Sequence, residues 1–165
     1  MKILVPVDGS QLSLAAVRYV LGLVRQGLRA ELVLANVQAP ASLYEFVVAR
    51  DPVLIHDASA GAGAHLLEPA QALCRAAGVS FECEVVSGDP VQVLCDLAEQ
   101  YGCESIVIGA HGKGALASAL LGSVSQALAH ASPVPVTVVK QPDADRPADY
   151  QAPAQSAAGH PAARR

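Results

Sequence analysis

The residues whose types and spacing suggest chemistry lie between positions 109 and 125, in the stretch GAHGKGALASALLGSVS. Gly109 and Gly112 are three positions apart and follow an apolar run, and nine residues separate Gly112 from Gly122-Ser123, where a second helical pattern begins. Glycine lets the backbone turn sharply and approach a ligand closely. A helix that begins at a serine has N–H groups that can bind an anion. Together, the two elements would form a phosphate-binding site.

The spacing of these glycines differs from three common motifs. The segment from Gly109 to Gly114 does not fit G-x-G-x-x-G, which binds dinucleotides. It does not fit G-x-x-x-x-G-K-[ST] either, because Lys113 is followed by Gly114. The G-x-S-x-G motif of serine hydrolases does not occur. The remaining pattern is G-x2-G-x9-G-S.

Short apolar segments that alternate with helical patterns predict the fold class. Strands that alternate with helices are typical of a parallel sheet covered on both faces. We therefore expect a doubly wound α/β domain. The nearly continuous apolar character of the first and fourth segments places them at the centre of the sheet. The expected strands are residues 2–7, 31–37, 79–86, 105–108 and 134–139.

Capping residues predict where the helices begin and end. Asp89 suits an N-cap and Pro90 the first helical position. Gly27 suits the position just past a helix end. The Gly/Ala stretch 58–64 is expected to lead into a helix rather than to belong to it. The first expected helix begins at Ser10 or Gln11, and a short helix is expected within 43–49. The next begins after residue 64 and ends near Ala77, and the last runs from Ser123 to His130. Between these two, a helix begins at Pro90 and should direct four residues inward: Val93, Leu94, Leu97 and Ala98.

Asp8 follows the first expected strand, and Gly109 follows the fourth. Open α/β sheets bind ligands beyond the carboxyl ends of their strands, where the strand order reverses. A carboxylate in that crevice can accept hydrogen bonds from a ribose hydroxyl, while N–H groups of the glycine loop contact phosphates. Asp8 also suits a turn or helix N-cap in Asp-Gly-Ser. The two roles are compatible, because one oxygen can cap while the other binds.

On these residues the chain resembles the universal stress protein family, and specifically its ATP-binding branch. The family motif is G-x2-G-x9-G followed by Ser or Thr. The segments ILVPVDGS at the start, GDP at 88–90 and PVPVTVV at 133–139 agree as well. The resemblance covers residues 1–140 as one universal stress protein domain. It implies a Rossmann-like, adenine nucleotide alpha hydrolase-like open sheet of five parallel strands in the order 3-2-1-4-5, with helices on both faces.

The resemblance also implies a binding site for ATP, with or without Mg²⁺. The motif glycines and Ser123 would hold phosphates, Asp8 would contact the nucleoside, and the backbone of Val37 would meet adenine. His111 is expected to shape the loop, and no catalytic residue or protein metal ligand is assigned. The expected nucleotide-binding residues are Pro6, Val7, Asp8, Val37, Gly109, His111, Gly112, Gly122, Ser123, Val124 and Ser125.

Composition and charge limit the partners. The chain has 165 residues, a net charge of −4 and no Lys/Arg cluster in its body, which argues against nucleic-acid and anionic-membrane surfaces. The start lacks the features of a signal peptide, and no segment is apolar enough to span a bilayer, so we expect a cytoplasmic protein. The family resemblance implies a homodimer formed through the last strand, 134–139.

The cysteines and the C-terminal segment are expected to play no part in the chemistry. Cys74, Cys83, Cys95 and Cys103 lack C-x-x-C spacing, so we expect small buried apolar side chains in a reducing compartment rather than a zinc site. Residues 141–165 are rich in Pro, Ala and Gln with few large apolar side chains. Such a composition is typical of a disordered tail.

The leading functional hypothesis is a nucleotide-dependent regulator of the stress response. One alternative is a slow ATP hydrolase, although the sequence offers no arginine finger or Walker-type magnesium aspartate. The other is a nucleotide-free dimerisation module of the same fold. The intact glycine motif weighs against that module.

Overall fold

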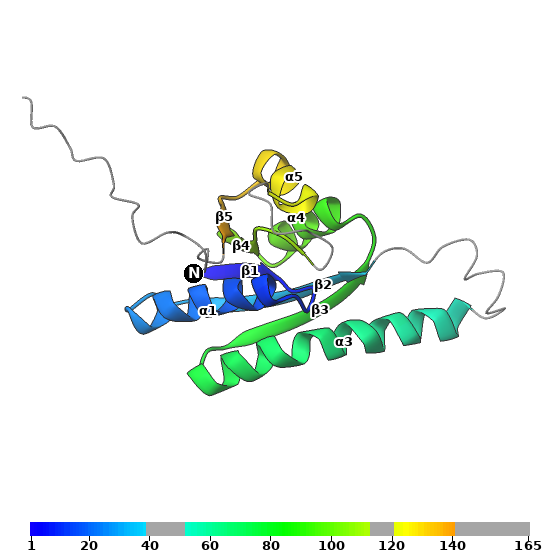
Figure 1. The fold of residues 1–165 in the computed structure, drawn as a ribbon, viewed down its shortest axis with the longest axis horizontal. Coiled ribbons are helices and arrows are strands. Elements are labelled where there is room, and N and C mark those ends of the chain that lie inside the picture. The colour runs from blue at the N-terminus through cyan, green and yellow to red at the C-terminus, as the bar shows by residue number, and fades with distance from the viewer. Residues whose placement is uncertain (39–51, 113–120, 141–165) are drawn as a thin grey trace, which may run out of the picture.

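The protein folds around a parallel sheet that matches the predicted topology. The computed structural model describes residues 1–38, 52–112 and 121–140. The strand order, β3-β2-β1-β4-β5, confirms the expected α/β fold with five parallel strands (Figure 1). The strands are β1 (Lys2–Pro6), β2 (Glu31–Gln38), β3 (Phe81–Ser87), β4 (Ser105–Gly109) and β5 (Val136–Val139).

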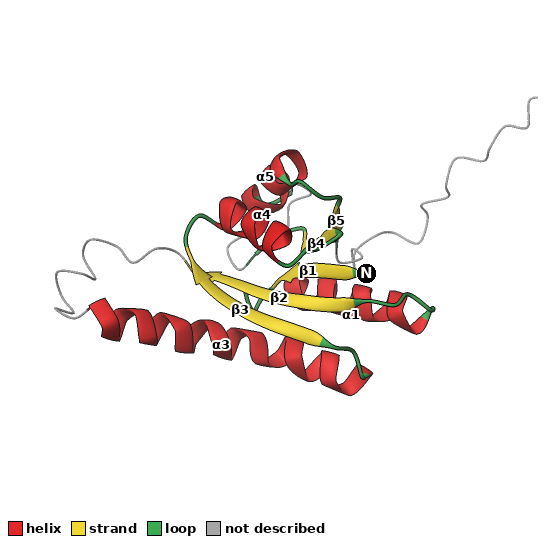
Figure 2. Ribbon diagram, turned by 180° about the vertical axis from the view of Figure 1, so that it is seen from behind, coloured by secondary structure: helices red, strands yellow, loops and turns green. Residues whose placement is uncertain are grey.

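Helices cover both faces of this sheet, α1 and α3 on one face and α4 and α5 on the other (Figures 1 and 2). Successive strand residues point to opposite faces. Ile3 and Val5 therefore pack into the core under α1 and α3, while Leu4 packs into the core under α4 and α5. All three are at most 2% exposed. The helices are α1 (Gln11–Arg25), α3 (Pro52–Ala77), α4 (Pro90–Gln100) and α5 (Ser123–Ala131).

The predicted caps Asp89 and Gly27 are present at the helix ends, and Ser10, which was predicted only as a possible first residue of the helix, caps α1. Ser10 is the N-cap of α1, and its Oγ accepts a hydrogen bond of 3.1 Å from the Ser13 amide. Asp89 is the N-cap of α4, and its Oδ1 accepts the amides of the second and third helical residues at 3.0 Å each. Gly27 follows α1 with φ +109°, a conformation that glycine adopts without strain. In α4, Leu94, Leu97 and Ala98 are buried as predicted, and Val93 is half-buried.

The prediction for the start of α3 was wrong. The helix begins at Pro52 and contains the Gly/Ala stretch 58–64, which we expected to precede it. A glycine is needed at position 63 of this helix because a Cβ there would lie 2.4 Å from Val85 Cγ1 on β3. Packing against the sheet therefore outweighs the low helix propensity of glycine. The predicted end at Ala77 is confirmed, and Gly78 follows it with φ +66°.

Some strand boundaries differ from prediction. β1 ends at Pro6 and β2 extends to Gln38. β3 begins two residues late, because the Val79 amide donates to Cys74 O and so completes the end of α3. β5 begins at Val136 rather than Val134. The predicted short helix within 43–49, loop residues 113–120 and the predicted disordered tail 141–165 lie outside the described residues.

Two of the four cysteines are buried as predicted, and two are not. Cys74 and Cys103 are buried, and burial raises the pKa of the Cys74 thiol to about 11. Cys83 is exposed because it lies on β3, an edge strand, and Cys95 is half-buried. Both departures contradict the expectation of buried side chains.

Two further findings concern metals and membranes. In the described part of the chain, no group of three or more His, Cys, Asp or Glu side chains could hold a metal ion. Among the helices described here, none combines the length and the apolar character needed to cross a membrane.

Candidate functional site

The candidate site begins where β1 and β4 separate. The two strands are paired at Ile3–Ser105 and Leu4–Ile106 only. Beyond these pairs, β1 stays paired with β2 as far as Pro6, and β4 stays paired with β5 as far as Gly109. The carboxyl ends of the two central strands therefore diverge where the strand order reverses. This is the usual place of a ligand site in an open α/β sheet.

A cavity of about 180 Å³ lies at this divergence. Every predicted nucleotide-binding residue lines it except Ser123. Sequence reasoning missed six lining residues, which come from α1, α4 and the strand ends. The Gly-Asp-Pro turn at 88–90 was a signal for two of them, since it places the start of α4 at the carboxyl edge of the sheet. The six residues are Ser13, Ala35, Pro90, Leu94, Ile108 and Ala110.

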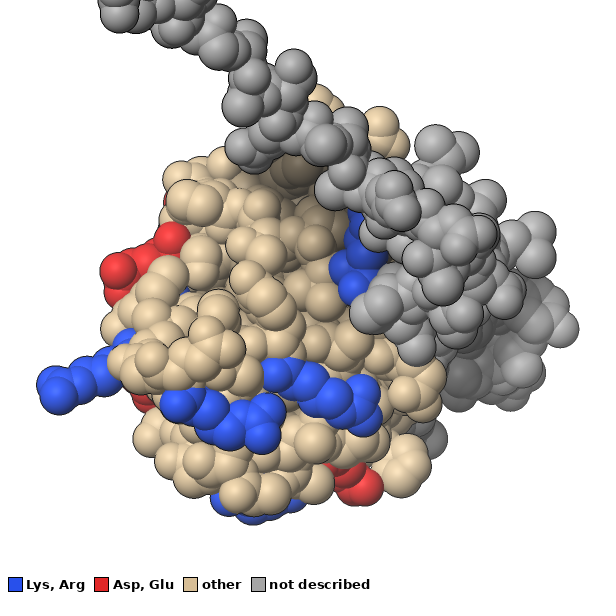
Figure 3. Space-filling view, turned by 60° about the vertical axis from the view of Figure 1, so that its left-hand side comes forward, with Lys and Arg blue, Asp and Glu red and all other residues tan. Residues whose placement is uncertain are grey.

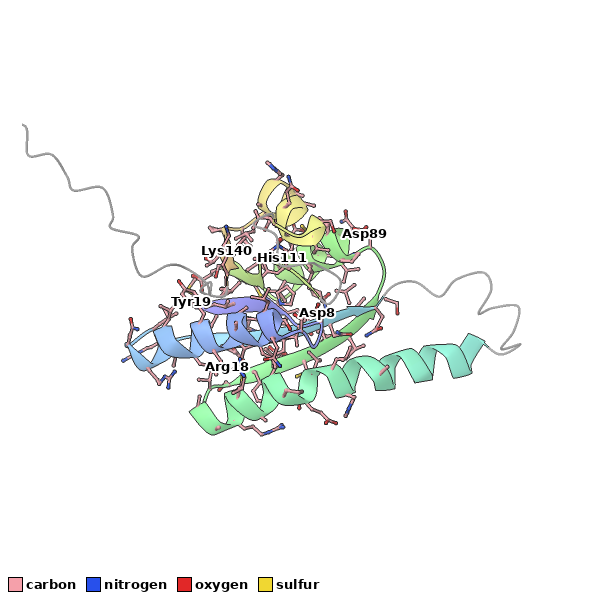
Figure 4. All side chains as sticks on the ribbon, in the orientation of Figure 1. Asp8, Arg18, Tyr19, Asp89, His111 and Lys140 are labelled. Carbon is pink, nitrogen blue, oxygen red and sulfur yellow. The ribbon has the colours of Figure 1, made fainter. Side chains whose placement is uncertain are left out.

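Asp8 is held in the turn that leaves β1. Its Oδ1 accepts a hydrogen bond of 2.9 Å from the Ser10 amide, so the predicted turn role is present. The preceding residue, Val7, donates its amide to Ala35 O at 2.8 Å. The other carboxylate oxygen faces the glycine loop, because a Cβ on Gly112 would lie 2.7 Å from Asp8 Oδ2. Figure 4 shows Asp8 and His111 at the same edge of the sheet, in the segments that follow β1 and β4.

Each glycine of the motif permits a close approach within the protein. A Cβ on Gly109 would lie 2.8 Å from the backbone carbonyl of Leu12, so the missing side chain lets β4 pack against the first turn of α1. A Cβ on Gly122 would lie 3.1 Å from Ala110 O. The Gly122 amide, expected to contact phosphate, donates instead to Ala110 O at 2.7 Å. The glycines therefore bring three backbone segments together at the cavity.

The N-terminus of α5 lies at the cavity. Gly122 is its N-cap and has no side chain to accept the first helical amides, and the first backbone bond runs from Gln126 N to Gly122 O at 2.9 Å. Val124 and Ser125 line the cavity, whereas Ser123 does not. Aligned peptide dipoles give such an end a partial positive charge. The arrangement favours an anion at this side of the cavity.

Ser125 has a structural role in this arrangement. Its side chain is buried, and its Oγ lies 2.9 Å from the carbonyl oxygens of both Ala110 and Gly122. A hydroxyl has one proton and can donate to one carbonyl at a time. Either bond fastens the first turn of α5 to the segment after β4.

The charges of the lining residues are few. Asp8 is the one carboxylate among the described lining residues, and none of these residues is Lys or Arg. The described Lys and Arg side chains lie outside this lining, and Figure 3 shows some of them gathered on one face of the molecule. Lys113, which follows Gly112, lies outside the described residues. No described lining residue carries the permanent positive charge of a Lys or Arg, so an anion in this part of the site would depend on N–H groups, above all those at the start of α5.

Comparison with known proteins identifies the family. Residues 1–140 match the universal stress protein family. The chain belongs to this family.

Two relatives resemble this universal stress protein over most of its length. Universal stress protein MJ0531 of Methanocaldococcus jannaschii is 28% identical over 141 residues, which is 86% of this chain and 82% of the relative. Universal stress protein YxiE of Bacillus subtilis is 30% identical over 146 residues, which is 84% of this chain and 98% of the relative. The match to three mycobacterial universal stress proteins covers 25% of their length.

Solved structures share the fold. MJ0577 of Methanocaldococcus jannaschii has a TM-score of 0.72 at 27% identity, with 86% of this chain and 96% of that chain covered. A family member from Arabidopsis thaliana with AMP bound has a TM-score of 0.61 at 25% identity, covering 90% and 97%. A universal stress protein in complex with cAMP has a TM-score of 0.59 at 27% identity, covering 85% and 96%.

The close approach at Gly109 predicts a large stability effect of a small substitution. Gly109→Ala places a methyl group 2.8 Å from the backbone of Leu12, which cannot move without shifting α1. We expect the free energy of unfolding in urea to fall by about 1–3 kcal/mol. Gly22→Ala is the matched control, because a Cβ at Gly22 meets no atom within 4 Å. It should raise stability by roughly 0.5–1 kcal/mol. Equal stability of the two variants would contradict this account.

Proposed function

We propose that this chain is a cytoplasmic universal stress protein that binds ATP and acts as a nucleotide-dependent regulator in the stress response. One observation carries the proposal: the Asp8 carboxylate and the N-terminus of α5 lie on the lining of one cavity at the strand divergence. A carboxylate suits ribose hydroxyls, and a helix N-terminus suits phosphates. The AMP-bound and cAMP-bound relatives support an adenine nucleotide.

The nucleoside end is proposed to lie between Asp8 and the apolar wall. Ala35 and Val37 on β2 and Pro90 and Leu94 on α4 supply apolar surface for a base. We assign the ribose hydroxyl to Asp8 Oδ2, because this is the carboxylate oxygen that faces Gly112 on the lining of the cavity. The described cavity, about 180 Å³, is smaller than the about 300–1,000 Å³ of pockets that enclose a drug-sized ligand. We therefore propose that the described residues would enclose only a part of the nucleotide.

The phosphate end is proposed to lie at the first turn of α5. An anion at a helix N-terminus gains about 0.3–1 kcal/mol, and up to ~2 kcal/mol when partly buried. Micromolar affinity needs roughly 8 kcal/mol. Amides of the segment after β4, base burial and ribose hydrogen bonds must supply the remainder. Mg²⁺ would enter with the phosphates, which are its usual partners in nucleotide sites.

The first prediction from this proposal is saturable binding of ATP. Calorimetric titration of the purified, nucleotide-stripped protein with ATP and Mg²⁺ should give one site per chain. Mass spectrometry of the denatured protein should identify the adenine nucleotide that co-purifies with it. The absence of saturable binding up to millimolar ATP would contradict the proposed function.

A second prediction concerns Gly122. In Gly122→Val, a branched side chain would grow from a Cβ position 3.1 Å from Ala110 O and 3.4 Å from His111 Cα. It would push α5 away from the segment after β4 and fill the space that phosphates need. We expect ATP binding to be lost in calorimetry. Gly22→Val in α1 controls for a branched residue at a glycine, and urea unfolding separates lost binding from lost fold. Wild-type affinity in Gly122→Val would place the ligand elsewhere.

We also propose that the protein forms a homodimer through the outer edge of β5. Pro135 O and Val139 O accept hydrogen bonds from Ile106 N (2.9 Å) and Ala110 N (2.8 Å), so these residues face β4. Residues of a strand alternate in the side to which their backbone groups point. Val136 and Val138 therefore direct their backbone groups away from β4, toward the edge. An edge of this kind is a template for pairing with another chain.

The dimer proposal predicts a specific effect of proline at Val138. Val138→Pro removes an outward N–H and leaves in place the bonds that Ile106 N and Ala110 N donate to Pro135 O and Val139 O. We expect a dimer for the wild type and a monomer for this variant in analytical ultracentrifugation. Val138→Ala, which keeps the N–H, should remain dimeric. A monomeric wild type, or a dimeric Val138→Pro, would overturn this part of the proposal.

A further inference from the structure

Asn36 is a buried polar side chain to which the proposed function gives no role. It lies near the end of β2 and is 2% exposed. Its Nδ2 donates a hydrogen bond of 2.7 Å to Val7 O, and its Oδ1 accepts a hydrogen bond from Gln38 Nε2. Only the NH₂ end of an amide can donate to a carbonyl. With both ends bonded, the Asn36 amide has one orientation.

The bond from Asn36 reaches the residue that precedes Asp8. Val7 is held by β2 on both of its backbone groups, since its amide donates to Ala35 O at 2.8 Å and its carbonyl accepts from Asn36. Asp8 is then fixed on its other side by the Ser10 amide at 2.9 Å. Asn36 therefore supplies one of the three hydrogen bonds that hold the chain between the end of β1 and the turn of Asp8.

Helix α3 packs against the same amide pair. A Cβ on Gly63 would lie 2.8 Å from Asn36 Oδ1, 3.2 Å from Gln38 Nε2 and 2.4 Å from Val85 Cγ1. The missing side chain at Gly63 thus leaves the space that the two amides occupy. Gly61, two residues earlier in the same helix, has no atom within 4 Å of its Cβ position. Of these two positions in α3, only position 63, which packs against Asn36, requires a glycine.

We propose that Asn36, seated against Gly63, is the positioning residue for Asp8, and that it determines how strongly the site prefers a ribose over a deoxyribose. The proposal rests on the proposed function, in which Asp8 accepts a ribose hydroxyl. Carboxylate hydrogen bonds need their partners within a few tenths of an ångström of the productive geometry. The turn meets this demand before the nucleotide binds, because one backbone–backbone bond, the Asn36 amide and the bond from Ser10 N to Asp8 Oδ1 already hold it. The phosphates, which bind at α5, do not depend on Asn36.

Asn36→Asp tests the proposal with almost no change of shape. The variant places a carboxylate oxygen against Val7 O, where the wild type has a donor. We expect the preference for ATP over 2′-deoxy- and 3′-deoxy-ATP to fall about fivefold, as the loss of one hydrogen bond implies. Affinity for inorganic tripolyphosphate, which has no ribose, should fall no more than the affinity for the two deoxy nucleotides, because the added charge of the aspartate acts on every phosphate ligand alike. A merely structural defect would weaken the binding of all these ligands together.

Gly63→Ala tests the same path from the other side of Asn36. Its methyl group would displace the Asn36 amide, so the ribose preference should fall as it does in Asn36→Asp. Gly61→Ala is the matched control and should keep the wild-type preference. The double variant Asn36→Asp/Gly63→Ala should lose no more than the larger single loss, because both changes act through one amide. Full additivity, or an unchanged preference in both folded single variants, would overturn the proposal.

Hydrogen exchange of the Ser10 amide separates this proposal from the proposed function. That amide donates to Asp8 Oδ1, so its exchange without nucleotide reports how firmly the turn is held. Exchange should be faster in Asn36→Asp and Gly63→Ala and unchanged in Gly61→Ala. Wild-type exchange in both variants would overturn the positioning role. If the wild type binds no ATP, the proposed function is wrong, and the proposed ribose preference is wrong with it. The hydrogen-exchange rate of the Ser10 amide would still show whether Asn36 positions Asp8.

Discussion

The separation of β1 from β4 is the constraint on which the rest of the structure depends. Both strands are central, and they share two residue pairs before they part. Each is then held by its other neighbour, β1 by β2 and β4 by β5. A sheet cannot fill the gap between diverging strands with its own backbone bonds. The loops that follow the two strands must therefore satisfy their polar groups locally, and they form the cavity wall in doing so.

The glycines of the motif line the cavity and also allow close packing within the protein. Gly109 admits the backbone of Leu12, Gly112 admits the Asp8 carboxylate, and Gly122 admits Ala110 O. These contacts bring α1, the turn after β1 and the start of α5 to one place. A side chain at any of the three positions would separate the walls of the cavity before it met a ligand. The fold without a ligand therefore requires glycines at the same three positions that the phosphate-binding motif specifies.

The sequence was sufficient for features that depend on local chemistry. Capping at Asp89 follows from a side chain that bonds its own helix, and the apolar periodicity located each described strand to within two residues at either end. The resemblance supplied the strand order. The start of α3 was missed because glycines at 61 and 63 are typical of a segment that precedes a helix. Only the close packing of Gly63 against the sheet explains why a glycine lies inside this helix. Asn36 was missed because its partners, Val7 O and Gln38, are defined by the turn of the chain and not by a pattern.

The two ends of the cavity are supported by different layers of the molecule. Asp8 is fixed through β2 and Asn36, which packs under α3 on one face of the sheet. The start of α5 is fixed through Ala110 and Ser125, and α5 belongs to the core on the opposite face. A change in the packing of α3 therefore reaches the carboxylate end without passing through the helix N-terminus. Because couplings travel through contiguous packed groups that have alternative arrangements, the two faces provide separate routes by which a site of this kind can be tuned.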